Sequence, residues 1–344
     1  MTRICLMVVW MGPFTKEYRL WLNSVEKNPT IDFYVITDQE KPVDCPSNVF
    51  YIKSSLKEVK AKFEENLGMK IRLERPYKLC DYKPIWWMLM DERLYNYDFY
   101  GHCDVDLVFG DLRHFLTEDF LSEYDKCFDT GYFILYRNNE EMRNLFRRSL
   151  DKDNAAYPYK KAFKTDFACY FDEFMGMSIL SWQYKKGYVD QLKEDYIQDF
   201  SWKRLDFNSY ITHKSFVIHW INGKLYRVEV DESGNIIEDL SNGKMGKELL
   251  LVHIQKRKMD ICFNADDKNE ASDYWIYPNK YTREKPNGIL YTEEEKAEYA
   301  EKIRISDREK QWKNLKQYGI IQYIPHFLRT RKIRKFIRTE KGYF

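Results

Sequence analysis

The chain has 344 residues, 44% of them hydrophobic and 32% charged, which is typical of a soluble globular protein with one large domain or two modest ones. A net charge of +2 offers no general affinity for nucleic acid, and seven cysteines without a CxxC pair argue against a disulfide framework or a thiolate zinc site. No segment reaches the roughly 18 apolar residues of a membrane span, and the N-terminal run predicts a strand instead of a signal peptide. These features favour a cytoplasmic protein.

The N-terminal part of the chain predicts a β-α-β unit. Residues 3–10 read as a buried strand, residues 16–28 carry apolar side chains at helical spacing, and residues 31–38 read as a second strand. Such a unit implies a right-handed crossover and a parallel sheet, in which ligands bind beyond the carboxyl ends of the strands. The residues expected at this edge are Val9, Trp10, Thr37 and Asp38.

Strands and helices continue to alternate along the chain. Strands are expected at 49–53, 97–104, 131–137 and the start of 249–259, and helices at 55–67, 139–150, 291–304 and 323–338. Asp81 could cap a helix with Pro84 in its first turn, and Asn222-Gly223 predicts a hairpin. The pattern predicts an α/β fold with a mixed sheet flanked by helices over residues 1–262, followed by a helical extension over 263–344.

The stretch GHCDVDLVFGDL places Asp104 and Asp106 at the end of the strand expected at 97–104. Side chains two residues apart on a strand point the same way, and two carboxylates this close repel each other unless solvent, a Lys or Arg, or a metal ion lies between them. Asp151-Lys152-Asp153 has the same spacing in a polar connection, so spacing alone decides little. A divalent ion on two or three hard oxygens would suit pyrophosphate chemistry, with magnesium or manganese as the metal.

A third ligand is expected among the histidines, because imidazole would favour manganese. His253 ends an apolar strand and is followed by Lys256, Arg257 and Lys258, which could bind phosphates or form a solvated basic turn. His219 lies in the expected hairpin, where a structural role is the alternative.

Three sequence blocks, YKLCDYKP, CDVDLVFGDLRHFL and HIQKRKM, resemble those of GT-A-fold glycosyltransferases, especially family 8 and bacterial polysaccharide-cluster enzymes. The resemblance covers about residues 1–262 and implies a GT-A-like, Rossmann-like sheet. It implies that Asp104 faces the ribose and the metal, and that Asp106 and His253 bind the metal. Lys256 or Lys258 would contact the diphosphate of the donor.

The same resemblance implies roles for further residues. Thr37 and Asp38 would lie where the nucleotide base binds. Three residues would approach the donor from the helix before the strand at 97–104, namely Lys78, Asp81 and Lys83. Helix capping and surface charge are the alternative roles for these three. The acidic pair Asp172-Glu173 would contact the acceptor or act as base, or else cap a helix.

The chain departs from the family pattern at one block. Family 8 enzymes usually carry His-x-x-Gly-x-x-Lys-Pro-Trp, whereas HIQKRKM has no glycine or Pro-Trp, and VIHWINGK keeps a histidine, a glycine and a lysine. The third ligand therefore stays open between His253 and His219. The family 8 likeness favours retention of stereochemistry, which the residues themselves do not settle.

The C-terminal tail is basic and amphipathic. Ile320, Ile324, Phe327 and Leu328 lie at helical spacing before a cluster of arginines and lysines, which suits an anionic membrane surface or a helix packed on the domain.

The sequence as a whole predicts a metal-dependent transferase that uses a nucleotide sugar, with UDP favoured, and a saccharide or lipid-linked saccharide acceptor in surface polysaccharide synthesis. A metal-dependent nucleotidyl- or phosphotransferase is the enzymatic alternative. A membrane- or RNA-docking protein is the non-enzymatic one.

Overall fold

The computed structural model describes residues 1–129, 131–150, 156–173, 175–187, 196–199, 203–207, 215–237, 246–255 and 257–341.

The first sheet contains the predicted N-terminal strands. Its order is β3-β2-β1-β4-β7-β6, with β1 to β4 parallel and β7 antiparallel to both of its neighbours. The strands are β1 (Ile4–Trp10), β2 (Ile31–Thr37), β3 (Val49–Lys53), β4 (Phe99–Cys103), β6 (Lys126–Cys127) and β7 (Phe133–Arg137). The predicted α/β fold with a mixed sheet flanked by helices and a C-terminal helix is confirmed.

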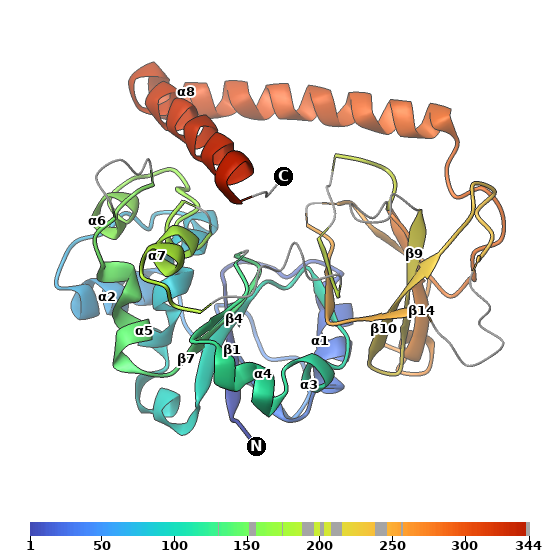
Figure 1. The fold of residues 1–344 in the computed structure, drawn as a ribbon, viewed down its shortest axis with the longest axis horizontal. Coiled ribbons are helices and arrows are strands. Elements are labelled where there is room, and N and C mark those ends of the chain that lie inside the picture. Colours follow the sequence, from blue (N-terminus) through green and yellow to red (C-terminus); the bar gives the residue numbers. More distant parts are fainter. Residues whose placement is uncertain are drawn as a thin grey trace.

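Both faces of this sheet are buried. Alternate residues of β1 enter two different apolar clusters, Met7 and Val9 on one face and Leu6 and Val8 on the other. A parallel sheet covered on both sides has this continuous apolar sequence because neither face meets water. Figure 1 shows α2, α5 and α7 on one side of the sheet and α1 on the side of the second sheet.

Two predicted helices show how far local sequence signals decide the structure. Ser55 and Glu58 form a capping box at the start of α2 (Leu56–Leu67), as the predicted helix requires. The helix expected after Asp81 is instead a long 3₁₀ segment, η1 (Pro76–Leu89), that already begins at Pro76. Asp81 is not a helix cap, because its carboxylate accepts hydrogen bonds from the distant backbone N–H groups of Cys169 and Phe171.

The remaining helices of this part of the chain are short, apart from the nine-residue α1. They are α1 (Tyr18–Glu26), η2 (Asp91–Asn96), α3 (Leu112–Phe115), α4 (Glu118–Glu123), α5 (Glu140–Asn144), η3 (Leu145–Arg147), α6 (Tyr159–Ala162), α7 (Met177–Gln183) and η5 (Glu270–Ser272).

A second sheet lies beside the first. Its strands are β11 (Lys247–Leu249), β10 (Lys224–Glu229), β9 (Phe216–Ile221), β14 (Asp273–Ile276), β15 (Lys280–Thr282) and β13 (Asp260–Ile261), in that order. The predicted hairpin joins β9 to β10, and both turn residues, Asn222 and Gly223, have the positive φ of a type I′ turn. Strands from both sides of residue 262 pair in this sheet, and the domain boundary expected there stays a prediction.

A small three-stranded sheet connects the two larger ones. It contains β5 (Leu107–Phe109), β12 (Leu251–His253) and β8 (Ile197–Asp199), with β12 in the centre. The Trp220 indole of β9 donates to the Phe109 carbonyl of β5 at 3.0 Å, which joins the second sheet to the small one.

The C-terminal helix α8 (Glu293–Lys341) has two arms that meet at Gly319, whose φ of 71° is not helical. The first arm crosses the molecule above both sheets, and the second turns back toward its centre (Figure 1). The second arm packs on the domain through His326, Arg329 and Ile333, with Arg329 donating to the Ala156 carbonyl at 2.8 Å.

The outer face of the second arm is apolar and exposed. Its exposed side chains are Ile320, Ile321, Ile324 and Leu328. Within the residues described, no helix combines the length and apolar character that crossing a membrane requires.

The packing of His326 predicts a pH-dependent stability. Burial lowers the pKa of His326 from 6.5 to about 4, so the folded protein holds the neutral imidazole while the unfolded chain protonates it below pH 6.5. The resulting stability is present above pH 6.5 and is lost as the pH falls toward 4. We expect His326→Phe, which keeps a ring against Phe167, to show a smaller fall of the thermal unfolding midpoint over this range. Equal falls for the two proteins would contradict this role of His326.

Candidate functional site

A cavity of about 1170 Å³ opens at the carboxyl ends of β1 and β4. Its walls come from the ends of these strands, from η1, from the turn at 170–173, from the segment after β12 and from the second arm of α8. The cavity lies where parallel α/β sheets place their ligands, because strand ends there leave backbone and side chains free of the core.

Asp104 and Asp106, called the DxD motif below, lie at the wall of this cavity, although not on a strand. Strand β4 ends at Cys103, so the prediction that its last residues carry both carboxylates on one face is wrong. The connection is shaped by two hydrogen bonds: Asp104 N–H donates to the Tyr132 carbonyl at 2.9 Å, and the Asp106 carbonyl accepts from Ile254 N–H at 3.1 Å.

The pairing of β12 with β5 brings His253 to the same place. His253 lies opposite Leu107, the residue that follows Asp106. One ligand atom from each of Asp104, Asp106 and His253 lies within 4.8 Å of the others, and His253 Nε2 is 3.5 Å from Asp106 Oδ1. The Tyr132 ring packs on the imidazole with centroids 4.1 Å apart.

His219, the other candidate for third ligand, lies elsewhere. It is on β9 in the second sheet, where its Nε2 is 2.6 Å from Asp273 Oδ1 and its ring stacks on Trp275. Neither His219 nor Asp273 lines the cavity. The geometry therefore groups His253, and not His219, with the two aspartates.

Lys83 is the positive charge next to the motif. Its ammonium, on a side chain that is 7% exposed, lies 2.7 Å from Asp104 and 3.4 Å from Asp172, and it donates to the Gly131 carbonyl at 2.7 Å. Burial opposes the charge of Lys83, but the two carboxylates outweigh it and raise the pKa of the amine. Burial also raises the pKa of Asp104, and the Lys83 charge opposes that rise.

The acidic pair at 172–173 lies against Gly131. A Cβ on Gly131 would meet Asp172 Oδ2 at 2.3 Å, so only glycine permits this approach. Asp172 is 1% exposed, and its Oδ1 has no hydrogen-bond partner among the described residues. Burial raises the pKa of Asp172 well above its ordinary value, which makes its carboxylate a stronger base. Both Asp172 and Glu173 line the cavity.

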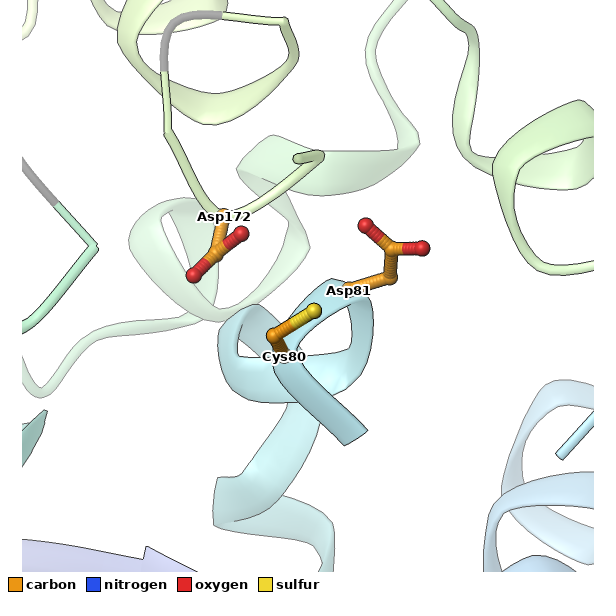
Figure 2. A group of neighbouring side chains, drawn as sticks. All are labelled: Cys80, Asp81 and Asp172. Atoms are coloured by element: carbon orange, nitrogen blue, oxygen red, sulfur yellow. The ribbon is translucent and has the colours of Figure 1, made fainter. Parts of the chain in front are cut away.

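A second group with metal-binding residue types contains Cys80 and Asp172, which line the cavity, and Asp81, which does not. Figure 2 shows Cys80 and Asp81 on one turn of η1 and Asp172 on the facing loop. Asp81 already accepts from Lys78 Nζ at 2.6 Å and from two backbone N–H groups, and burial raises the pKa of the Cys80 thiol well above its ordinary value. A carboxylate whose oxygens already accept several hydrogen bonds and a protonated thiol are poor ligands for a metal ion.

Lys78 and Asp81 have internal contacts. Lys78 also donates to the carbonyls of Ala162 and Phe167 at 2.9 and 2.7 Å, and neither Lys78 nor Asp81 lines the cavity. Their predicted contact with a donor stays a prediction, and the contacts they make are structural.

The other expected donor contacts divide into two groups. Val9, Trp10 and Lys258 line the cavity, and Lys258 is exposed. Thr37 and Asp38 do not line it; Thr37 is buried, and Asp38 accepts from Gly12 N–H at 2.9 Å. Lys256 lies outside the described residues.

Many wall residues were not among the predicted site residues. Among them are Tyr77, Trp86, Tyr132, Tyr170, Ile333 and Arg334. Tyr132 directly precedes β7, and the antiparallel pairing of β7 with β4 places it beside Asp104. The strands predicted at 97–104 and 131–137 could have suggested this pairing. Arg334 had no such signal, because only the bend at Gly319 brings the tail to the cavity.

We predict that the protein binds Mn²⁺ through Asp104, Asp106 and His253. Asp106→Asn should weaken binding by at least about tenfold, since losing one anionic ligand costs on the order of 1.4 kcal/mol or more. Titration followed by the electron paramagnetic resonance signal of free Mn²⁺ measures this. His253→Ala should also weaken binding, whereas the matched change His219→Ala should not. The ligand assignment fails if Asp106→Asn binds Mn²⁺ as well as the wild type.

The comparisons with solved structures give distant similarities to glycosyltransferases. The apo form of the glycosyltransferase GlyE of Streptococcus pneumoniae is 13% identical, with 59% of this chain and 47% of that chain covered and a TM-score of 0.28. A second structure of GlyE is also 13% identical, with 56% of this chain and 46% of that chain covered and a TM-score of 0.27. The galactosyltransferase LgtC in complex with donor and acceptor sugar analogues is 13% identical, with 57% of this chain and 75% of that chain covered and a TM-score of 0.27. The matched region thus spans about half the length of GlyE.

A search of curated proteins finds no match. A family profile does match, over residues 6–285, which include both large sheets apart from the first two residues of β1, and all three candidate metal ligands. The chain therefore belongs to the family of unknown function DUF6625.

Proposed function

We propose that the protein is a metal-dependent glycosyltransferase that moves a sugar from a nucleotide diphosphate sugar, with UDP as the preferred nucleotide, to a saccharide acceptor. The observation that carries this proposal is the meeting of Asp104, Asp106 and His253 at the wall of a cavity of about 1170 Å³. Single-ligand pockets commonly have about 300–1000 Å³, so this cavity has room for a donor with an acceptor beside it.

The donor set fits a divalent cation. Two carboxylates and one imidazole, within 4.8 Å of one another, suit manganese or magnesium, with the imidazole favouring manganese. When bound, the cation would neutralise charge on the diphosphate of the donor. Asp104, Asp106 and His253 would hold it.

The other wall residues would position the donor. Lys258 is exposed and lines the cavity, and its ammonium would contact a diphosphate oxygen, while Val9 and Trp10 would contact the nucleoside. Lys83 would keep Asp104 in place, because its ammonium bridges Asp104 and Asp172.

Transfer would form a bond between an acceptor hydroxyl oxygen and the anomeric carbon of the sugar. The bond from that carbon to the diphosphate breaks, and the nucleoside diphosphate leaves with the electron pair. In an inverting reaction Asp172 or Glu173 would take the hydroxyl proton, and the raised pKa of Asp172 favours proton acceptance. In a retaining reaction, which the family 8 likeness favours, this pair would instead position the acceptor, and the hydroxyl proton would pass to the departing diphosphate.

A nucleotidyl- or phosphotransferase could use the same two aspartates. In that reaction the attack is at phosphorus, so a nucleotide sugar would release nucleoside monophosphate or a sugar phosphate instead of nucleoside diphosphate. The product therefore separates the two enzymes in one assay.

We predict metal-dependent release of nucleoside diphosphate from one member of a panel of nucleotide sugars. Asp106→Asn should reduce the rate by about a hundredfold, as expected when a group that stabilises the leaving charge is removed. A coupled assay for nucleoside diphosphate, with candidate acceptors added, measures this. His219→Ala serves as the control and should keep the wild-type rate. An active donor that Asp106→Asn turns over at the wild-type rate would contradict the proposal.

The location proposed for this reaction is the cytoplasmic face of the plasma membrane, with a lipid-linked saccharide of surface polysaccharide synthesis as acceptor. Support comes from α8, whose exposed apolar side chains Ile320, Ile321 and Leu328 share an arm with arginines and lysines. Apolar side chains next to basic ones suit an anionic lipid surface.

We predict that the protein sediments with vesicles that contain phosphatidylglycerol. Ile321→Glu should reduce the bound fraction several-fold, because it places a negative charge in the apolar face. Val43→Glu is the matched control, since Val43 is also fully exposed but lies far along the chain from α8. Equal loss in both variants, or none in Ile321→Glu, would count against membrane docking through α8.

A further inference from the structure

The second arm of α8 forms part of the cavity wall. Ile333 is 1% exposed and belongs to the main apolar cluster of the first sheet, and the next residue, Arg334, lines the cavity. One turn earlier, the Arg329 guanidinium lies 4.1 Å from the Tyr157 ring centroid. This end of the chain is therefore built into the site, beyond the part that matches the family profile.

Arg334 and the acidic pair Asp172-Glu173 line the same cavity. The charge of Arg334 acts on Tyr170, where it opposes the effect of burial, which together with neighbouring charges raises the pKa of that phenol to about 12. Tyr170, Asp172 and Glu173 are on the same turn. Tyr170 has a φ of 53°, and such strain in a residue other than glycine persists where the surrounding structure imposes it, often at ligand sites.

Arg334 is exposed, lines the cavity and has no carboxylate within ion-pair distance of its guanidinium among the residues described. Lys83 and Lys16, which also line the cavity, have carboxylate partners, and Lys258 is a second exposed cation of the wall without one among the described residues. Arginine presents a planar set of donors that matches carboxylate and phosphate groups. An arginine placed in this way suits an anion that arrives with a ligand.

We infer that the acceptor is an anionic saccharide and that Arg334 binds its negatively charged group, so that the C-terminal helix completes the acceptor side of the cavity. The inference rests on the function proposed above, because it takes the end with Asp172 and Glu173 as the acceptor side. It names the class of acceptor, a sugar that carries a phosphate or a carboxylate.

The test is a binding measurement on the full chain without donor or metal. Isothermal titration compares glucose 6-phosphate, glucuronate and glucose, and the wild type should bind at least one anionic sugar more tightly than glucose. Arg334→Ala should weaken that binding by about tenfold or more, the effect of losing a hydrogen bond to a charged group. Whichever of glucose 6-phosphate and glucuronate shows the loss identifies the anion.

Two further variants separate charge from structure. Arg331→Ala removes an arginine of the same arm that is also exposed but does not line the cavity, and this variant should bind the anionic sugar as the wild type does. Arg334→Lys keeps the charge without the planar donors, and it should recover part of the affinity. Equal binding of all three sugars by the wild type, or unchanged binding in Arg334→Ala, would overturn the inference.

The donor provides the other decisive comparison. If Arg334→Ala weakens the binding of UDP with Mn²⁺ more than that of the anionic sugar, Arg334 serves the donor and the inference is overturned while the proposed function stands. Conversely, a protein that turns over no nucleotide sugar but binds the anionic sugar through Arg334, in the wild type and in Asp106→Asn alike, would retain the anion site and lose the proposed function.

Discussion

The candidate site depends on the antiparallel pairing of β5 with β12. Three residue pairs, from Leu107 with His253 to Phe109 with Leu251, join two segments that are far apart in the chain. This pairing alone places an imidazole beside Asp106, and the hydrogen bond from Ile254 N–H to the Asp106 carbonyl at 3.1 Å fixes the aspartate against it. A slip of one residue would turn His253 to the other side of the strand and separate the three groups.

Lys83 provides the second constraint, which is electrostatic. Asp104 and Asp172 are carboxylates on different segments, and both have a pKa raised by burial. The ammonium of Lys83 lies between the two carboxylates and reduces their mutual repulsion, so that both can line the cavity. Lys83 reaches this point because η1 is a 3₁₀ segment held by Asp81, whose carboxylate binds the backbone at Cys169 and Phe171. The same backbone contacts position the turn with Asp172.

Local sequence signals predicted much of the fold and part of the site. The strand at 49–53, the helix at 55–67 and the Asn222-Gly223 turn were predictable because propensity, capping and turn chemistry act over a few residues. The 3₁₀ form of η1 was not, because Asp81 finds its partners far along the chain. The choice between His253 and His219 required the strand pairing, and the approach of Arg334 required the bend at Gly319. The contacts that could not be predicted are those between segments far apart in the chain, because no local sequence signal specifies them.

The most direct measurement is X-ray diffraction at the manganese absorption edge from crystals grown with Mn²⁺ and UDP. We expect one anomalous peak bounded by Asp104, Asp106 and His253, with the diphosphate of UDP in contact with the ion. Bound UDP with no peak among these three residues, or a peak at another place in the molecule, would contradict the assignment of this site to a nucleotide diphosphate and its metal.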